Sequence, residues 1–496
     1  MEKAGGYRVV ALTQKKTSTA KTTPEKSPPF KWITVSLQEV VEKDYRLEAS
    51  VYGIEGRQAR KDLEKCKWDI AALCGENGLA TAYHRPRFKR IYVEKSDYPI
   101  YQPAQINELH PKPSAYISDL TQTDINALRV KKGQVLLTCS GTIGNCTYVK
   151  NTFYNLIFSH DLIRIMPKEY NGYIYVYLKS RIGFNIINTN NYGAVISHIE
   201  PEHLNNVPIP NPSAILKQKI HDLIEKSFQL RDESNVLMDE AQVLLKEALQ
   251  LPEIEKLQTK AKQFDKKAGV LNYTVPLSEL NNRLDGSYHV PLVKAIENHI
   301  HKTAKEVLKV GDSQISQAVF LPGRFKRVYV SEGSGVNFFG GKQLLELYPK
   351  TGKYLSFGKH DKRIENELKL KVNQILISRS GTIGKITIVP NHWEKCVASE
   401  DVIRITPNNE CIAGYLYAFL CSPYGLILLK RVAFGAVQDH VSDKQVSEIS
   451  IPLLQDGNTQ KIINDKVLLA NKKRARAYEL EQEALQILND KVIYAE

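Results

Sequence analysis

The chain has 496 residues, roughly three to four times the length of a typical domain, which predicts two or more domains. Hydrophobic residues make up 42% of it and charged residues 25%, proportions that exclude a largely disordered chain, a collagen-like repeat and a disulfide-dense miniprotein. Lysine and arginine number 68 against 54 acidic residues, a formal net charge of +14 that favours a polyanionic partner, nucleic acid first. A solvated basic surface without a partner is the alternative.

The cysteines and the hydropathy indicate the compartment. The seven cysteines are an odd number and none forms a C-x-x-C pair, so the sequence has neither a zinc ribbon nor a thioredoxin-like motif. The N-terminus lacks the apolar core of a signal peptide, and no uninterrupted apolar run approaches the roughly 18 residues of a membrane span. We therefore expect a soluble cytoplasmic protein with no membrane partner.

The first segment, residues 1–30, is rich in Lys, Thr, Ser and Pro and ends at Ser27-Pro28-Pro29. It contains few residues that could build a core, so we expect a flexible basic tail. Order is expected to begin near Phe30.

The remainder of the chain repeats itself. The heptapeptide Arg-Phe-Lys-Arg-Ile-Tyr-Val at 87–93 recurs as Arg-Phe-Lys-Arg-Val-Tyr-Val at 324–330, and Ser-Gly-Thr-Ile-Gly at 140–144 recurs at 380–384. Matches in one order, at an offset that drifts slowly from 237 to 242, predict a tandem duplication with a unit of about 240 residues. Four further matches pair 45–50 with 282–287, 161–165 with 401–405, 193–195 with 435–437, and 209–210 with 451–452.

Each unit has the same internal plan. Short β-branched and aromatic runs, such as 89–93 and 162–165, predict strands, and Gly172–Ser180 and Gly414–Ser422 predict short helices that begin after a glycine. We expect an α+β protein with globular units of mixed α/β structure at 31–210 and 263–452. A long helical segment follows each unit, at 211–262 and at 453–496.

The closing segments carry a seven-residue repeat, which is a coiled-coil pattern. The first segment has leucines every seven residues and, four positions after each, mostly small residues: Leu216, Leu223, Leu230, Leu237 and Leu244, then Ile220, Ser227, Ser234, Ala241 and Ala248. The second segment repeats the small ladder and adds two apolar residues, with lysines where the first has leucines: Ile463, Ala470, Ala477 and Ala484, then Leu480 and Ile487, then Lys466 and Lys473.

Two arrangements of these helices stay open. A segment of about 35 residues spans about 50 Å as a helix. The simplest interpretation is that the two helices pack against each other and set the globular units apart. The alternative is that each helix packs on its own globular unit.

Motifs for catalysis are absent from the sequence. It has no G-x-x-x-x-G-K-[ST] phosphate loop, no G-x-G-x-x-G after a strand and no H-E-x-x-H, and His84, His160 and His392 stand singly. No Asn/Asp-Pro-Pro-aromatic box is present, and Glu400-Asp401 is better explained by structure than as a nuclease ligand pair. The chain therefore does not resemble an enzyme.

Basic residues suggest binding instead. Arg87, Lys89 and Arg90 put three cations in four residues, and strand alternation would send Arg87 and Lys89 to one face. Such an edge suits phosphate contacts, which position a protein without reading sequence, but a solvated edge strand protected by charge is equally compatible. The candidate set includes the second copies: Arg324, Lys326 and Arg327.

The Ser-Gly-Thr-Ile-Gly loops and the segments that differ between the units supply further candidates. The loop glycines suit tight turn packing, and the hydroxyls are weaker candidates for DNA contact: Ser140, Thr142, Ser380 and Thr382. The two units differ most at 97–124 against 333–361 and at 152–158 against 392–398. The side chains suited to base edges there cannot be ranked: Tyr98, Tyr101, Gln102, Gln105, Asn107, Asn337, Lys342, Gln343 and Lys359.

The motifs together resemble a known family. The order Ser-Gly-Thr-Ile-Gly (140–144), Asp-Leu-Ile-Arg-Ile (161–165), Gly-Ala-Val-Ile-Ser-His-Ile-Glu-Pro-Glu-His-Leu (193–204) and Val-Pro-Ile-Pro (207–210) before a Gln-Lys-Ile helix start resembles the DNA specificity subunit of type I restriction–modification systems. The resemblance covers both halves from about residue 32. The match is looser in the second copy, where Gln438-Asp439-His440-Val441-Ser442 replaces 196–200, and the basic tail is not part of the usual pattern.

The resemblance implies an architecture and partners. Two target-recognition domains would each read one half of an interrupted DNA site, and two long antiparallel helices would set the spacing and dock methyltransferase subunits, probably two, through residues of the seams: Leu223, Leu230, Leu237, Ala241, Ala470, Ala477, Leu480 and Ala484. The chain itself would be non-catalytic and hold no cofactor or metal. S-adenosylmethionine, ATP and Mg²⁺ would bind to the methyltransferase and restriction subunits. The alternatives are a specificity subunit of another modification or phage-defence complex, or an assembly scaffold with degenerate recognition domains.

Overall fold

The computed structural model describes residues 32–42, 45–85, 87–189, 197–260, 273–280, 283–435 and 438–495. The tail predicted for 1–30 lies outside the described residues. The repeat match at 193–195, and most of its copy at 435–437, lie outside them too.

Each half of the chain contains the same central antiparallel sheet, built from buried strands of Val, Leu and Ile. In the first unit the order is β2-β9-β6-β7, and in the second it is β12-β19-β16-β17. The strands are β2 (Ala80–Tyr83), β9 (Leu162–Pro167), β6 (Val135–Thr138) and β7 (Cys146–Tyr148), then β12 (Ser316–Phe320), β19 (Val402–Pro407), β16 (Ile375–Ser378) and β17 (Ile386–Ile388). The matching order confirms the duplication.

A second four-stranded sheet with one parallel pair completes each unit. Its order is β3-β5-β4-β8 in the first unit and β13-β15-β14-β18 in the second. The strands are β3 (Tyr92–Val93), β5 (Ala115–Ile117), β4 (Pro99–Tyr101) and β8 (Ile157–Phe158), then β13 (Tyr329–Val330), β15 (Tyr354–Ser356), β14 (Gly335–Phe339) and β18 (Cys396–Ala398).

The second sheet gives 97–124 and 333–361, which differ in sequence, the same backbone pairing. The pair Pro99↔Tyr116 in one unit corresponds to Asn337↔Tyr354 in the other, at a common offset of 238. At that offset Glu-Leu-His-Pro-Lys (108–112) aligns with Glu-Leu-Tyr-Pro-Lys (346–350). The residues around this match differ in size and polarity between the units, which hides the correspondence in the sequence although the backbone pairing is the same.

Helices and a small sheet cover each central sheet. The helices are α2 (Ile54–Glu64), α4 (Asn171–Lys179) and α5 (Arg181–Asn188) in the first unit, and α8 (Pro291–Thr303), α10 (Glu410–Cys421), α11 (Pro423–Arg431) and α12 (Asp443–Ser447) in the second. The two-stranded sheets pair β1 (Ile70–Ala72) with β10 (Pro208–Pro210), and β11 (Glu306–Lys309) with β20 (Ser450–Leu453). The shorter helices are α1 (Leu37–Glu42), α3 (Ile125–Leu128), α7 (Ile254–Lys260) and α9 (Phe357–Arg363).

The predicted short helices are present, but Gly414 does not begin one. It lies inside α10, and a Cβ there would come within 2.3 Å of the Asn464 carbonyl oxygen. Gly172, near the start of α4, meets the backbone of His221 in the same way at 2.8 Å. These glycines allow a close approach between α4 or α10 and the long helix that follows it.

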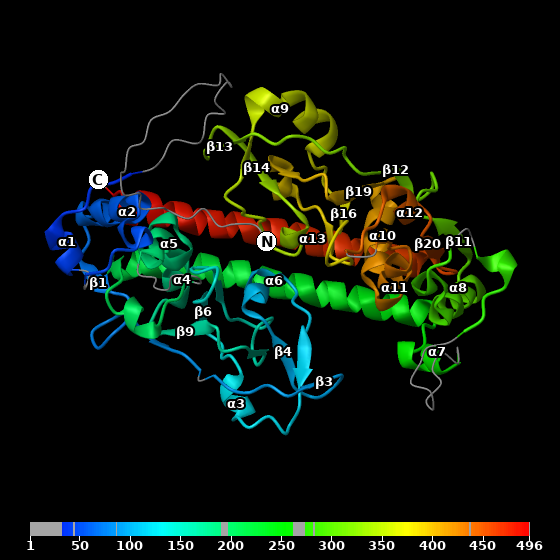
Figure 1. The fold of residues 1–496 in the computed structure, drawn as a ribbon, viewed down its shortest axis with the longest axis horizontal. Helices are drawn as coiled ribbons and strands as arrows, with labels where there is room; N and C mark the ends of the chain where they lie inside the picture. Colours follow the sequence, from blue (N-terminus) through cyan, green and yellow to red (C-terminus); the bar gives the residue numbers. More distant parts are fainter. Residues whose placement is uncertain are drawn as a thin grey trace, which may run out of the picture.

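Two long helices, α6 (Ala214–Ala248) and α13 (Gly457–Leu488), run antiparallel along the molecule (Figure 1). Most of the predicted small ladder is fully buried between and beneath them, including Ala241, Ala470, Ala477 and Ala484. Lysines that replace leucines form ion pairs across the seam: Lys466 with Glu240 and Lys473 with Glu233, each at 2.6 Å. The antiparallel pair is thus confirmed.

The first long helix is shorter than the range 211–262. It ends at Ala248, because Gln250 has a left-handed φ of +49° and Pro252 cannot continue the helical hydrogen bonding. A separate helix, α7, then begins at Ile254.

Each globular unit packs on both long helices. The core of the first unit includes Ile220 and Phe228 of α6, and also Ala484 and Leu488 of α13. The core of the second unit likewise includes residues of both: Met238, Ala241, Leu245, Ile463, Val467 and Ala470. Both predicted arrangements are therefore present: the two long helices pack against each other, and each also packs on the globular units. In Figure 1 the outer sheets of the two units lie on opposite sides of the helix pair.

Within the described residues, no single helix has the length and hydropathy needed to cross a membrane. One bent pair, α10 with α11, passes the test jointly, and both helices contribute to the core of the second unit.

Candidate nucleic-acid interface

The basic segment of the first unit alternates as predicted, although little of it is a strand. Arg87 and Lys89 are exposed, while Phe88 and Arg90 are half-buried. Ladder pairing with β5 covers β3 (Tyr92–Val93), and one further bond, from the Ser118 amide to the Ile91 carbonyl oxygen at 2.8 Å, extends it by a residue. Of the predicted strand at 89–93 only the second half is thus paired, and Arg87 and Lys89 are exposed on the segment that leads into it.

The second basic segment also exposes Arg324 and Lys326. Its third cation differs from the first unit in its partner. Arg90 donates through Nη2 to Nδ1 of His160 at 3.0 Å, whereas Arg327 forms an ion pair with Glu400 at 2.5 Å. His160 and Glu400 occupy the same repeat position, at an offset of 240.

The Ser-Gly-Thr-Ile-Gly loops are tight turns in both units. Their glycines all have left-handed φ angles: +72° and +92° in the first loop and +74° and +106° in the second. Each loop is closed by a hydroxyl on the preceding strand, Thr138 donating to the carbonyl oxygen of Thr142 at 2.6 Å and Ser378 to that of Thr382 at 2.8 Å. The glycines therefore serve the turn, as predicted. Ser140 and Ser380 are half-buried, and the side chains of Thr142 and Thr382 are exposed.

A pocket of about 310 Å³ joins the basic segment to the first loop. Arg87 and Ser140, which are 53 residues apart, both line it. So do three histidines that the sequence leaves single: His84, His160 and His198. Strand β9 follows His160 and strand β2 ends beside His84, so the pairing of these neighbouring strands brings the histidines together, which no local pattern signals.

The acids of this pocket are held by its histidines. His84 Nδ1 lies 2.9 Å from Glu200, and His160 Nε2 lies 3.1 Å from Asp161. Because Arg90 donates to Nδ1 of His160, the ring proton is on Nε2 and donates to Asp161, which is the neutral form of the imidazole. Burial lowers the pKa of His160, the nearby Asp161 opposes this, and Arg90 adds to it. Among the described residues, no group of His, Cys, Asp or Glu could hold a metal ion.

Two candidate base-contacting residues are buried in the units. Tyr101 is 6% exposed and packs against Phe158, and Asn337 is 6% exposed and donates to the carbonyl oxygen of Pro349 at 2.9 Å. Gln105 is committed to its own loop, where its amide donates to the carbonyl oxygen of Lys112. Of the other candidates, Tyr98, Gln102, Asn107 and Gln343 are half-buried, and Lys342 and Lys359 are exposed.

The loop of the first unit that carries these residues contacts the equivalent loop of the second unit. Glu108 and Glu346, which are repeat equivalents, face each other in an antiparallel bridge, and Leu109 donates its amide to the carbonyl oxygen of Leu345 at 2.8 Å. Burial raises the pKa of Glu346 to about 8, with Lys179 and Lys385 opposing the rise. The contact thus has an approximate twofold relation and joins the two units directly.

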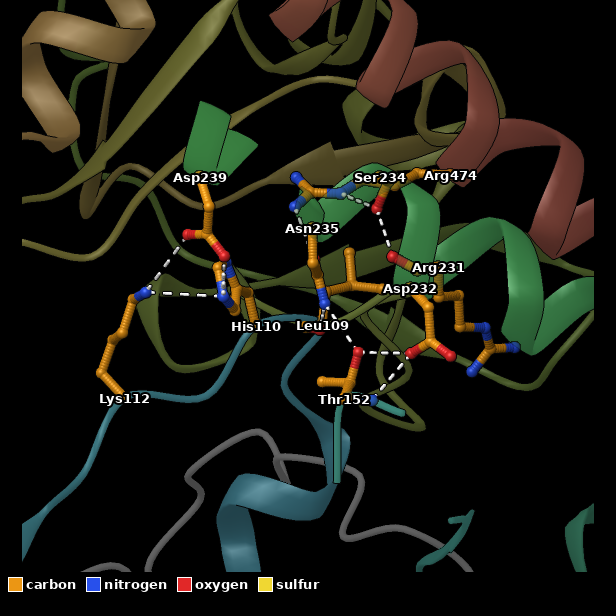
Figure 2. Close-up of polar contacts among 10 residues, drawn as sticks. All are labelled: Leu109, His110, Lys112, Thr152, Arg231, Asp232, Ser234, Asn235, Asp239 and Arg474. Atoms are coloured by element: carbon orange, nitrogen blue, oxygen red, sulfur yellow. Dashed lines mark hydrogen bonds and ion pairs between the residues drawn. The ribbon is translucent and has the colours of Figure 1, made fainter. Parts of the chain in front are cut away.

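Polar groups on α6 attach the first unit to the helix pair (Figure 2). Asp232 accepts from the amide and the hydroxyl of Thr152, at 2.8 and 2.6 Å. Asn235 donates to the carbonyl oxygen of Leu109 at 2.7 Å and to the Thr152 hydroxyl at 3.0 Å. Arg474 of α13 donates to the other side of Asn235 at 3.4 Å. One buried amide therefore links the unit to both helices.

Stacked aromatic rings attach the second unit to α13 at the position that corresponds to Asn235. Tyr478, 243 residues after Asn235, stacks on Tyr348 at 5.0 Å and on His392 at 4.3 Å between ring centroids. His392 and Trp393 both bond to the carbonyl oxygen of Leu347, at 2.6 and 2.9 Å. Burial lowers the pKa of His392 to about 4, which keeps the ring neutral and suited to stacking.

A buried charged cluster holds the end of α13 against the first unit. Glu481 is 4% exposed, forms an ion pair with Arg231 of α6, and accepts from the Tyr175 hydroxyl at 2.8 Å. Burial alone would raise the pKa of Glu481, but the charges of Arg231 and Lys179 outweigh it and lower the pKa to about 2.

Only part of the predicted partner-binding set is available for a partner. Leu223 and Leu480 line an apolar groove of about 670 Å³ at the start of α6, together with Tyr170 and the exposed Ile215. The small residues of the seam are fully buried and hold the helices together: Ala241, Ala470, Ala477 and Ala484. Leu230 is 9% exposed, and Leu237 packs against the core of the second unit.

Comparison with known proteins agrees with this architecture. The family model "Type I restriction modification DNA specificity domain" matches residues 79–235 and 351–467, together more than half of the chain. No curated protein matches the sequence.

Solved structures of low similarity belong to the same systems. The S subunit from M. genitalium is 15% identical, over 86% of this chain and 96% of that one, with a TM-score of 0.26. The HsdS subunit from Thermoanaerobacter tengcongensis is 14% identical, over 83% and 96%, with a TM-score of 0.24. The assignment rests on the family match. With two copies of the recognition fold on one helix pair, the chain belongs to the family of type I restriction–modification DNA specificity domains, whose members are non-catalytic DNA-recognition subunits.

Proposed function

We propose that this chain reads a bipartite, asymmetric DNA site and directs adenine-N6 methyltransferase subunits and restriction subunits to it. The observation that carries the proposal is the duplication itself. Two units with the same strand order sit on one pair of long helices, yet differ in the side chains around the basic segments. Two similar but unequal readers at a fixed separation suit a site made of two different half-sequences, whose spacing reflects the rigid distance between the readers.

The basic edges and the helix pair take separate roles in this proposal. The cations of the basic segments and the loop hydroxyls contact phosphates: Arg87, Lys89, Arg90, Ser140, Thr142, Arg324, Lys326, Arg327, Ser380 and Thr382. The groove at Leu223 and Leu480 belongs to the surface that methyltransferase subunits cover. S-adenosylmethionine, ATP and Mg²⁺ are bound by those partner subunits and the restriction subunits.

Modified-base sequencing of genomic DNA, with and without the gene, tests the proposal. We expect N6-methyladenine to disappear at one interrupted, asymmetric motif when the gene is deleted, and to return on complementation. A methylated motif that persists in the deletion strain contradicts the proposal and favours an assembly scaffold. The control is complementation with a chain in which 79–235 is replaced by the matching segment of a relative, which should change one half of the motif only.

A further inference from the structure

The segment that leaves the second sheet differs between the units in backbone structure as well as in sequence. The strand residues Tyr116 and Tyr354 correspond at an offset of 238, whereas the bridge residues Arg129 and Lys369 correspond at an offset of 240. The second unit therefore has two additional residues between these points. Helix α9 stands there in place of the first unit's loop at 119–124.

Helix α9 lies directly against the basic segment of the second unit. His360 accepts the Val328 amide at 3.1 Å, and its ring is 5.2 Å from that of Phe325 between centroids. Arg363 donates to the carbonyl oxygen of Gly323 and lies over the ring of Phe325 at 4.5 Å. These contacts fix α9 beside the exposed cations of that segment. In Figure 1 the helix stands at the outer end of the second unit, away from the helix pair.

The exposed side chains of α9 match the chemistry of base edges. Phe357 is 50% exposed, and Lys359 and Lys362 are exposed as well, with Asp361 between them. Within the described ranges neither lysine forms an ion pair, because the acids that follow in the chain are paired with other cations: Lys369 with Glu365 at 3.1 Å and Arg363 with Glu367 at 2.9 Å. A lysine can donate to O6 and N7 of guanine in the major groove, and an aromatic ring can contact the methyl group of thymine.

The first unit presents different chemistry at the corresponding place. Its loop at 119–124 contains two acids and no cation. Asp124 accepts the Ala127 amide at 3.2 Å and so caps α3, and Asp119 accepts from the hydroxyl of Ser118 at 3.0 Å. Two units that read different half-sequences must differ where they contact bases. The segment that contains α9 differs in this way beside an edge that the two units share.

We infer that α9 is a base-reading element of the second unit, which enters the major groove of one half-site with Phe357, Lys359 and Lys362 towards the base edges. The inference rests on the proposed function, because it assumes that the basic segment beside α9 faces DNA. The major groove is about 12 Å wide and admits a helix, while the phosphates that flank it are within reach of an adjoining basic edge. Lys359 is thereby ranked first among the base-contacting candidates, and Phe357 and Lys362 join it.

Three single substitutions test the inference: Phe357→Ala, Lys359→Ala and Lys362→Ala. Each is made in the full chain, which is co-expressed with its methyltransferase subunits in the deletion strain, and the methylated motif is read by modified-base sequencing. We expect at least one of them to relax the motif at one or two positions of a single half, lowering discrimination against the wrong base about tenfold there. The other half and the spacing should not change. The relaxed half should be the one that replacement of 79–235 leaves intact.

The control and the alternative outcomes separate base reading from charge alone. Lys302→Ala, at the exposed end of α8, removes the same charge from the second unit and should leave the motif unchanged. An unchanged motif in all three α9 variants overturns the inference alone, and so does relaxation of the half that 79–235 determines. A uniform loss of methylation at every site, with the same motif, makes α9 a phosphate contact and also overturns base reading. Absence of any motif that depends on the wild-type gene overturns the proposed function as well.

Discussion

Glu481 carries a charge at a buried position, and the free energy of that arrangement depends on its partners. Arg231 and Tyr175 contact its carboxylate, so removal of the acid leaves the largely buried guanidinium of Arg231 without its anion. The cluster lies where α13 meets the first unit. A single carboxylate therefore joins α13 to Arg231 of α6 and to Tyr175 of α4.

Replacing Glu481 with Ala should lower the free energy of unfolding by about 3–5 kcal/mol, measured by urea unfolding, because the charge of Arg231, whose side chain is 12% exposed, then has no anion. The wild-type contribution should depend on pH. The pKa of Glu481 is lowered to about 2, against about 4.3 in an unfolded chain, so its stabilisation is complete above about pH 4.3 and is lost as the pH falls towards 2. Glu479→Ala, in an exposed ion pair with Arg476, serves as the control and should change stability by less than about 1 kcal/mol.

The exposed cations Arg87 and Lys89 lead to a prediction about DNA binding rather than about stability. Replacing Arg87 and Lys89 by Ala should weaken binding to every duplex to a similar degree and lower the salt slope by up to about 2, because phosphate contacts carry no sequence information. Filter binding over a salt series measures both quantities. A changed sequence preference at an unchanged slope would contradict the phosphate role.

The helix pair shows how small residues determine the distance between elements. Ala470, Ala477 and Ala484 are fully buried on α13, and Ser227 of α6 donates to the carbonyl oxygen of Ala477 at 2.7 Å. A hydroxyl can reach the backbone of the other helix only where no larger side chain intervenes. The close approach and the ion pairs at the edges of the seam hold the two helices together.

Ala477→Leu should therefore overpack the seam and lower the free energy of unfolding by about 1–3 kcal/mol, because the added methyl groups have no free volume to enter. Val236→Leu on α6, where the side chain is 55% exposed, adds volume on a solvent-facing position and should be neutral. If Ala477→Leu lowered the free energy of unfolding no more than Val236→Leu does, the seam would tolerate a wider spacing between the helices.

At the scale of the whole molecule, residues near the C-terminus complete the core of the first unit. Val492 and Ile493 are at most 2% exposed and belong to the core of the first unit, and Tyr494 bonds to Asp62 at 3.0 Å. Together with the direct bridge at Glu108 and Glu346, this makes the two units and the helix pair one connected body. The first recognition domain is thus built from both ends of the described chain.

Two Val→Ala substitutions in the C-terminal segment test which unit each part of the segment stabilises. Val492→Ala should reduce amide protection in β6 and β9 of the first unit, more than 300 residues away in sequence, by about 2 kcal/mol. Val467→Ala, a matched change on α13, should reduce protection in β16 and β19 of the second unit instead. Hydrogen exchange measures both. Loss of protection in the same unit for both variants would contradict the division of the core.

Periodic and repeated features were predictable from the sequence, while contacts across distant segments were not. The heptads and the duplicated Ser-Gly-Thr-Ile-Gly loops are readable because each is defined by local spacing. The pocket that joins Arg87 to Ser140 needs the order of the central sheet, and the buried state of Asn337 needs the second sheet. The end of α6 near Ala248 is signalled in the sequence by Pro252, although the apolar pattern that continues past Gln250 extends the predicted helix beyond it.

The closure by Val492 and Ile493 also sets an order of events during synthesis. The ribosome makes chains at about 5–20 residues per second, so roughly 15–60 seconds separate the emergence of Pro210 from that of Ile493. Throughout that interval the first unit lacks the last part of its core, whereas the second unit is complete once α13 has passed Ala470. The half that is translated first is therefore the half that finishes folding last, and nascent chains paused before residue 487 should expose the apolar face that α13 later covers.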